Sequence, residues 1–211
     1  MPEVRRFAHV MSRLRAECPW DAEQTHRSLV PYLIEETCEV VDAIEDGDAA
    51  DLREELGDLL LQVFFHATIA AETETFDLDE VAAGVADKLV GRHPWVFAGA
   101  DTPDDLMGSW EERKRAEKAR TSALDGIAHR MSAMARAGKV VSRARAHRVE
   151  VSLPTEPVTA EDFGREVLDL VARAQHSGVD PEQALRDVLR GLEAEVRRVE
   201  GAEGEGSGAA R

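Results

Sequence analysis

Two short groups of carboxylates stand close together in this sequence, Glu35-Glu36-x-x-Glu39 and Glu55-x-x-Asp58. Side chains three or four residues apart share one face of a helix, so each group can direct its carboxylates toward one point. If the two segments pack as an antiparallel pair of helices, the two points coincide. Carboxylates gathered in so small a volume repel one another unless a cation joins them, and oxygen ligands select a hard cation such as Mg²⁺ or Mn²⁺. Mg²⁺ held by carboxylates keeps positions for phosphate oxygens, so the pattern indicates phosphate chemistry.

A solvated acidic helix face is the simple alternative, because Asp and Glu supply 42 of the 211 residues. The position of the carboxylates favours the site. Glu36 lies three residues after Leu33 and four before Val40, and Glu55 has a leucine at each of the same distances. Both groups therefore flank an apolar seam, where an unpaired charge is costly.

Length and composition favour an all-α helical bundle with a sizeable core, because helix-forming residues abound and β-branched runs are scarce. The formal net charge of −16 argues against nucleic acid or an anionic membrane as a partner. The two cysteines have neither metal-site spacing nor a disulfide framework, and no apolar run approaches the ~18 residues of a membrane span. We therefore expect a cytoplasmic protein.

Hydrophobic periodicity predicts a series of helices. Their expected ranges are residues 3–16, 31–46, 49–71, a helix from Asp77 or Asp79 to near Gly91, and a charged helix from about 103–105. A loop around Cys18-Pro-Trp-Asp is expected between the first two. Residues 59–65 are apolar nearly all round, which implies burial on several sides. A lone helical hairpin cannot provide that, so other helices or a second copy must complete the bundle.

The second half of the chain changes in charge. Residues 129–148 contain six Arg or Lys and no acid, whereas residues 35–58 contain eleven acids and one Arg. The basic segment could bind nucleic acid or pack against acidic helices of its own protein, and its alternation with Ala, Met and Val favours packing. Further on, Asp162-Phe-Gly-Arg-Glu-Val-Leu weakly repeats Glu55-Leu-Gly-Asp-Leu-Leu-Leu without the acidic pair, which indicates a degenerate second unit.

Longer strings resemble the MazG family of nucleoside triphosphate pyrophosphohydrolases. They are Cys18-Pro-Trp-Asp, Pro31-Tyr-Leu-Ile-Glu-Glu-Thr-Cys-Glu-Val-Val-Asp-Ala-Ile, Asp51-Leu-Arg-Glu-Glu-Leu-Gly-Asp-Leu-Leu-Leu-Gln-Val, Lys88-Leu-x-x-Arg-His-Pro, Trp110-Glu-x-x-Lys114 and Ser122-Ala-Leu-Asp-Gly-Ile. The resemblance implies a MazG-like four-helix core completed by dimerisation. It also implies Mg²⁺-dependent cleavage of NTPs or dNTPs to the nucleoside monophosphate and pyrophosphate, for nucleotide pool sanitation or stress-linked NTP control.

The resemblance, together with the composition of the second half of the chain, predicts how the chain is organised. We expect a catalytic helical domain over residues 1–120, a basic connecting helix over 121–150, a shortened and degenerate second repeat over 151–200, and a disordered tail over 201–211. Only the first module keeps the acidic motifs, so one type of active site is expected.

The family motifs assign roles to the acidic residues. Glu36, Glu39, Glu55 and Asp58 would bind Mg²⁺, with Mn²⁺ as a substitute. Glu35 would orient or deprotonate the attacking water, or it is a solvated helix charge.

The candidate substrate-binding residues are Lys88, Arg92, His93, Lys114, Lys118 and Trp20. The cationic ones would bind phosphates, and Trp20 would stack on the base or anchor the fold. Simpler alternatives are a surface lysine at Lys88 and a helix cap at His93. Lys114 and Lys118 could instead pair with glutamates of their own helix. Trp95 stands where family members often have His.

Two competing functions stay open. The chain could be a non-catalytic dimerisation module whose basic segment binds RNA or a partner. It could also be an enzyme similar to phosphoribosyl-ATP pyrophosphatase, which uses related chemistry on another substrate.

Overall fold

The computed structural model describes residues 1–118 and 120–208, without the side chains of Met107, Glu111, Glu112 and residues 202–208. Within these ranges every regular element is a helix, which confirms the predicted all-α class. The chain divides into two compact units, Met1–Ala100 (unit 1) and Asp101–Arg211 (unit 2).

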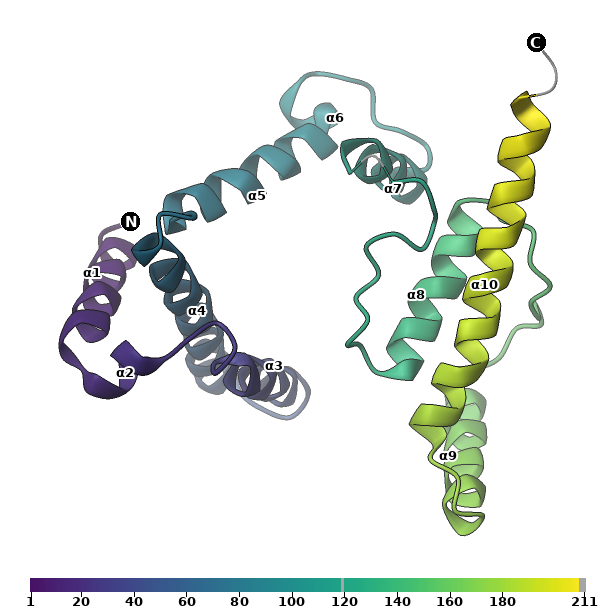
Figure 1. Ribbon diagram of the computed structural model, residues 1–211, viewed down its shortest axis with the longest axis horizontal. Helices are drawn as coiled ribbons and strands as arrows, with labels where there is room; N and C mark the ends of the chain where they lie inside the picture. Colours follow the sequence, from purple (N-terminus) through teal and green to yellow (C-terminus); the bar gives the residue numbers. More distant parts are fainter. Residues whose placement is uncertain (119, 209–211) are drawn as a thin grey trace. The chain divides into compact units, whose positions relative to one another are not determined.

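The helices of unit 1 follow the predicted ranges to within a few residues (Figure 1). They are α1 (Pro2–Glu17), α2 (Pro19–Glu23), α3 (Val30–Glu45), α4 (Ala49–Glu72), α5 (Leu78–Arg92) and α6 (Pro94–Phe97). One prediction was wrong, because the expected loop at Cys18-Pro-Trp-Asp contains the short helix α2. Pro19 begins α2, and a proline suits the first turn of a helix, where its missing N–H costs nothing.

Helices α3 and α4 form a hairpin and make the most extensive helix contact of unit 1. Only three residues connect them, so they run antiparallel. Asp48 caps α4, since its carboxylate accepts hydrogen bonds from the backbone N–H of Ala50 at 2.6 Å and of Asp51 at 3.1 Å. The Asp51 carboxylate in turn accepts from the N–H of Asp48 at 2.9 Å. This capping box fixes where α4 begins and thereby the register of the hairpin.

The apolar core of unit 1 lies between α1, α4 and the start of α3. Met11, Leu29, Phe64, Phe65 and Ile69 form its buried cluster. The rings of Phe7 and Phe64 stack with their centroids 4.5 Å apart. The face of α4 that packs here adjoins the face that carries the acidic residues, so the core holds the site-bearing helix in place.

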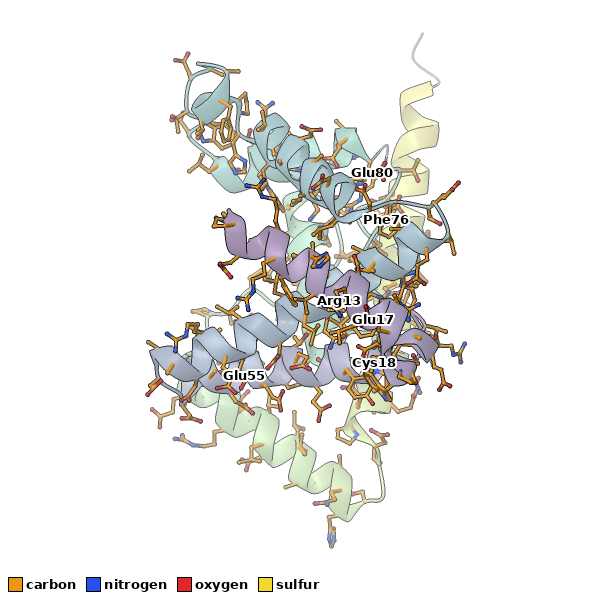
Figure 2. All side chains as sticks on the ribbon, turned by 90° about the vertical axis from the view of Figure 1, so that its left-hand side faces the viewer. Arg13, Glu17, Cys18, Glu55, Phe76 and Glu80 are labelled. Carbon is orange, nitrogen blue, oxygen red and sulfur yellow. The ribbon has the colours of Figure 1, made fainter. Side chains whose placement is uncertain are left out.

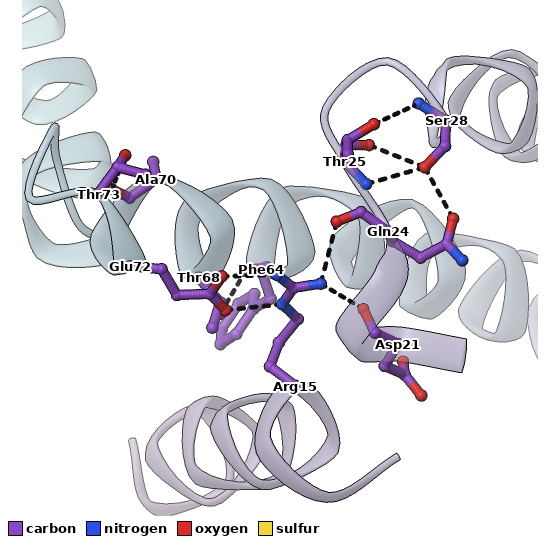
Figure 3. Close-up of polar contacts among 10 residues, drawn as sticks. All are labelled: Arg15, Asp21, Gln24, Thr25, Ser28, Phe64, Thr68, Ala70, Glu72 and Thr73. Atoms are coloured by element: carbon purple, nitrogen blue, oxygen red, sulfur yellow. Dashed lines mark hydrogen bonds and ion pairs between the residues drawn. The ribbon is translucent and has the colours of Figure 1, made fainter. Parts of the chain in front are cut away.

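Arg15 joins α1 to α4 and to the segment between α2 and α3 (Figure 3). Its guanidinium donates two hydrogen bonds to the Glu72 carboxylate, at 2.7 and 2.6 Å. It also donates to the carbonyl oxygen of Gln24 at 3.1 Å and to that of Asp21. The Arg15 side chain is 9% exposed, so these partners satisfy a nearly buried cation.

We expect acid to weaken the Arg15–Glu72 contact. The hydrogen bond that Glu72 accepts from Arg15 lowers the pKa of the Glu72 carboxyl. The contact therefore stabilises the fold above the pKa of an unfolded glutamate, and this stabilisation disappears as the pH falls through the lower pKa of the folded state. Glu72→Gln should lower the melting temperature at neutral pH and have a smaller effect in strong acid. Glu74→Gln is the exposed control, and equal effects of Glu72→Gln at both pH values would contradict the assignment.

Unit 2 contains α7 (Leu106–Glu117), α8 (Ala133–Ala146), α9 (Ala160–His176) and α10 (Pro181–Gly208). Helices α8 and α10 lie side by side (Figure 1). Their buried cluster consists of Ala123, Leu124, Ile127, Val140, Ala144, Val149, Leu189 and Val196. The α10 backbone is helical through Gly208, across most of the segment expected to be a disordered tail, and residues 209–211 lie outside the described residues.

The basic segment packs within unit 2 at two of its arginines. Arg136 forms an ion pair with Glu193 at 2.8 Å and donates to the carbonyl of Ala128 at 2.9 Å. Arg143 donates to the carbonyl of Ala123 at 3.2 Å. Both arginines are less than 8% exposed, so at these positions the charge is used inside the fold, as the alternation with apolar residues indicates.

None of the helices in the described ranges is long and apolar enough to cross a membrane.

Candidate metal and substrate site

Helices α3 and α4 bring three carboxylates to one point. One oxygen each of Glu36, Glu39 and Glu55 lies within 4.8 Å of the other two. Glu36 and Glu55 are half-buried at the edge of the helix pair, and Glu39 is exposed. Figure 2 labels Glu55 on this hairpin. We call these three side chains together with Asp58 the carboxylate cluster.

Asp58 and Glu35 lie at the border of this group. Asp58 is outside the set of three, but its charge helps to raise the pKa of both Glu36 and Glu55. Glu35 is exposed, and its charge also raises the pKa of Glu36. Glu36 therefore lies within the electrostatic influence of Glu35, Glu39 and Asp58, and Glu55 within that of Glu39 and Asp58.

The electrostatics of the carboxylate cluster fit a divalent cation. Desolvation raises the pKa of Glu36 and of Glu55, and the neighbouring carboxylates raise both further. In the described part of the chain, none of the ion pairs involves a member of the carboxylate cluster. Oxygen donors that repel one another and have no cationic side chain beside them are a suitable ligand set for Mg²⁺ or Mn²⁺.

Millimolar Mg²⁺ should raise the melting temperature of the protein by roughly 5 °C or more, because an ion that binds only the folded state stabilises it by mass action. The ion also removes the repulsion within the carboxylate cluster. Glu55→Gln should raise the melting temperature without metal and reduce the response to Mg²⁺. Glu45→Gln, an exposed change on α3, is the control. If Mg²⁺ raises the melting temperature equally in wild type, Glu55→Gln and Glu45→Gln, the ion binds outside the carboxylate cluster.

Three predicted phosphate-binding residues lie at the C-terminal end of α5. Lys88 is half-buried, and Arg92 is 7% exposed. The Nδ1 atom of His93 lies 2.7 Å from the carbonyl oxygen of Leu89, so His93 caps α5 through this atom. Figure 1 shows this end of α5 away from the α3–α4 hairpin. Within unit 1, the structure therefore does not bring these residues to the carboxylate cluster.

Lys114 and Lys118 belong to unit 2. The Nζ atom of Lys114 lies 4.5 Å from the centre of the Trp110 ring, a cation–π contact. The Nζ atom of Lys118 lies 3.5 Å from a carboxylate oxygen of Glu117. Both lysines thus have partners on or beside their own helix, and their phosphate-binding role stays a prediction.

Trp20, on α2, lies against two aromatic residues of the α3–α4 hairpin. It is 51% exposed, and its ring makes edge contacts with Tyr32 at 6.0 Å and Phe65 at 6.4 Å between centroids. Tyr32 and Gln62 were not among the predicted site residues, although helical spacing places both beside the acidic groups. Tyr32 lies four residues before Glu36, and Gln62 lies four residues after Asp58.

Comparison with known proteins gives this site a family. Residues 24–97, which include the whole carboxylate cluster, match the MazG nucleotide pyrophosphohydrolase domain. An uncharacterized 26.1 kDa protein from the blaB 3′ region of Streptomyces cacaoi is 46% identical over 91% of this chain and 80% of its own length. The nucleoside triphosphate pyrophosphohydrolase/pyrophosphatase MazG of Thermotoga maritima is 34% identical over 90% of this chain and 83% of its own.

Two further similarities cover less. The nucleoside triphosphate pyrophosphohydrolase of Escherichia coli K12 is 46% identical over 68% of this chain, which spans 57% of that relative's length. The crystal structure of a mazG-related protein from Thermotoga maritima is 29% identical with a TM-score of 0.47, and covers 53% of this chain and 98% of its own. Because the Thermotoga maritima MazG protein is similar over most of both sequences, this chain belongs to the MazG nucleotide pyrophosphohydrolase family.

Proposed function

We propose that this protein is a Mg²⁺-dependent nucleoside triphosphate pyrophosphohydrolase that cleaves NTPs or dNTPs to the nucleoside monophosphate and pyrophosphate. The observation that carries the proposal is the convergence of Glu36, Glu39 and Glu55 within 4.8 Å, inside the segment that matches the MazG domain. Relatives that cover most of this chain are named for the same activity.

The acidic residues divide into metal ligands and a base. Glu36, Glu39, Glu55 and Asp58 would hold Mg²⁺, or Mn²⁺ as a substitute. When bound, the ion would offset the negative charge that develops on the triphosphate oxygens. Glu35, which is exposed beside the carboxylate cluster, would orient the attacking water and accept its proton.

The substrate-binding roles are part of the same proposal. Lys88, Arg92 and His93 would bind the distal phosphates, and Lys114 and Lys118 would add further positive charge. Trp20 would stack on the base, since its ring is half exposed.

A steady-state assay of the four NTPs and four dNTPs, with identification of the products, tests the proposal. We expect pyrophosphate and the nucleoside monophosphate as products, and no turnover when a chelator removes the divalent metal ion. Release of orthophosphate, or turnover of phosphoribosyl-ATP alone, would contradict it. RNA binding that falls steeply with salt, without hydrolysis of any nucleotide, would favour the non-catalytic module instead. The substrate preference would also separate pool sanitation, which requires selectivity for unwanted nucleotides, from stress-linked control of the common NTPs.

A homodimer is the second part of the proposal. The hairpin exposes large apolar side chains on both helices, at 41–64% exposure: Ile34, Val41, Ile44, Leu56, Leu60 and Val63. Helix angle places these residues on the side of α3 and α4 opposite the aromatic contacts of Trp20. Apolar side chains gathered in this way mark an interface. A partner subunit could also supply the cationic end of α5 that lies away from the carboxylate cluster of its own chain.

Leu60→Asp should halve the mass in solution, measured by light scattering, because a carboxylate at the centre of the exposed hairpin face would be desolvated in a dimer. Val188→Asp, at a valine that is 73% exposed on α10, should leave the mass unchanged. A wild-type monomer, or a dimer that survives Leu60→Asp, would contradict an interface on this face.

A further inference from the structure

Gln62 is a buried polar side chain whose amide oxygen has no partner. The residue is 4% exposed, and its Oε1 atom makes no hydrogen bond within the described part of the protein. Leaving a buried acceptor unsatisfied is costly, and such groups in native proteins are normally paired with protein, water or ligand. Gln62 therefore needs a partner that the folded chain alone does not supply.

Helical spacing places Gln62 between the carboxylate cluster and the aromatic residues. On α4, Asp58 lies four residues before it and Phe65 three residues after it, so all three share one face. On α3, Tyr32 lies four residues before Glu36 and extends the same face of that helix. Gln62 thus occupies the middle of a track that is acidic at one end and aromatic at the other.

This order of groups matches the order of groups in a nucleotide. The acidic end would hold the metal and the phosphates. Trp20 and Tyr32, 51% and 39% exposed, offer ring faces on which a base can stack. The rise from Asp58 to Phe65 is about 10 Å along the helix axis, which leaves room for a sugar between phosphate and base. An amide between the phosphate site and a stacked base would meet the edge of that base, where a glutamine amide can donate and accept at once.

We propose that Gln62 determines base specificity by hydrogen bonding to the edge of the nucleobase that stacks on Trp20. This inference rests on the proposed function and adds to it the residue that distinguishes one base from another. A site with a buried hydrogen-bonding group rejects a ligand that leaves this group unpaired, because the lost bond adds to the cost of burial.

The test compares wild type with Gln62→Met, which keeps the length of the side chain and removes its hydrogen bonds. For the preferred base, kcat/KM should fall about 10- to 100-fold. The differences in kcat/KM among the eight NTPs and dNTPs should therefore become smaller. Turnover of deoxyribose 5-triphosphate, which has no base, should not change. The melting temperature without nucleotide should stay equal or rise, since an apolar group replaces an unpaired polar one. Gln62→Leu provides a second apolar variant.

Thr68→Val is the matched control, because Thr68 lies on the same helix but already donates its hydroxyl to the carbonyl of Phe64 at 2.8 Å. It should leave the base preference intact. An equal fall for every substrate, including the one without a base, would reduce Gln62 to a structural role and overturn the inference, as would unchanged preference.

The failure of the proposed function can be told apart from the failure of this inference. If wild type releases pyrophosphate from no nucleotide, the proposed function fails. Calorimetric titration with the nucleoside monophosphates then decides the role of Gln62. Stronger binding of one base by wild type than by Gln62→Met would support the inference, and equal binding of all bases by both proteins would overturn it.

Discussion

Glu39→Gln should reduce pyrophosphate release from nucleoside triphosphates by about 10²- to 10³-fold or more. Glu39 contributes one of the three oxygens that lie within 4.8 Å of one another. Replacing its carboxylate by an amide removes one negative charge from the carboxylate cluster while keeping the shape of the side chain. Because Glu39 is exposed, the change should leave the helical content and the mass in solution as they are.

Glu45→Gln is the matched control for this experiment, since it makes the same chemical change on the same helix outside the carboxylate cluster. It should turn over substrate at the wild-type rate. Asp58→Asn should act like Glu39→Gln if Asp58 is a ligand. Full activity in Glu39→Gln and Asp58→Asn, with folding confirmed by circular dichroism, would remove the carboxylate cluster from the mechanism.

The acidic part of the site could be predicted because it depends on local geometry. Residues three or four apart on a helix must share a face, and the three-residue connection between α3 and α4 allows only an antiparallel hairpin. The register also has a local cause, the capping box at Asp48 and Asp51. The convergence of Glu36, Glu39 and Glu55 therefore follows from short-range rules applied twice.

The contacts that hold the surroundings of the site depend on packing between distant segments, for which the sequence has no local signal. Arg15 meets Glu72 across 57 positions of the chain, and Trp20 meets Phe65 across 45. Gln62 lies one helical turn after Asp58, but its burial without a partner depends on tertiary packing, which helical spacing does not predict. Helix α2 was missed for a different reason, because five residues are too few for a periodic pattern to show.

Glu193→Ala should destabilise unit 2 by about 3–5 kcal/mol, because it would leave the charge of Arg136 buried without its counterion. The side chains of Arg136 and Glu193 are 8% and 11% exposed and lie 2.8 Å apart. Arg136 also donates to the carbonyl of Ala128, so its guanidinium is held in the core when Glu193 is removed. Chemical denaturation followed by circular dichroism measures the loss.

Asp187→Ala is the control on the same helix, because Asp187 pairs with Arg190 at an exposed position where an ion pair contributes little. A double variant, Arg136→Leu with Glu193→Leu, separates two causes of the effect. If the cost of Glu193→Ala comes from the unpaired charge, the double variant should recover most of the lost stability, since apolar pairs often replace buried ion pairs without loss. If the double variant is as unstable as Glu193→Ala, the stability of unit 2 depends on the hydrogen bonds from Arg136 to the segment before α8. Arg136 would then be needed for these hydrogen bonds as well as for its ion pair with Glu193.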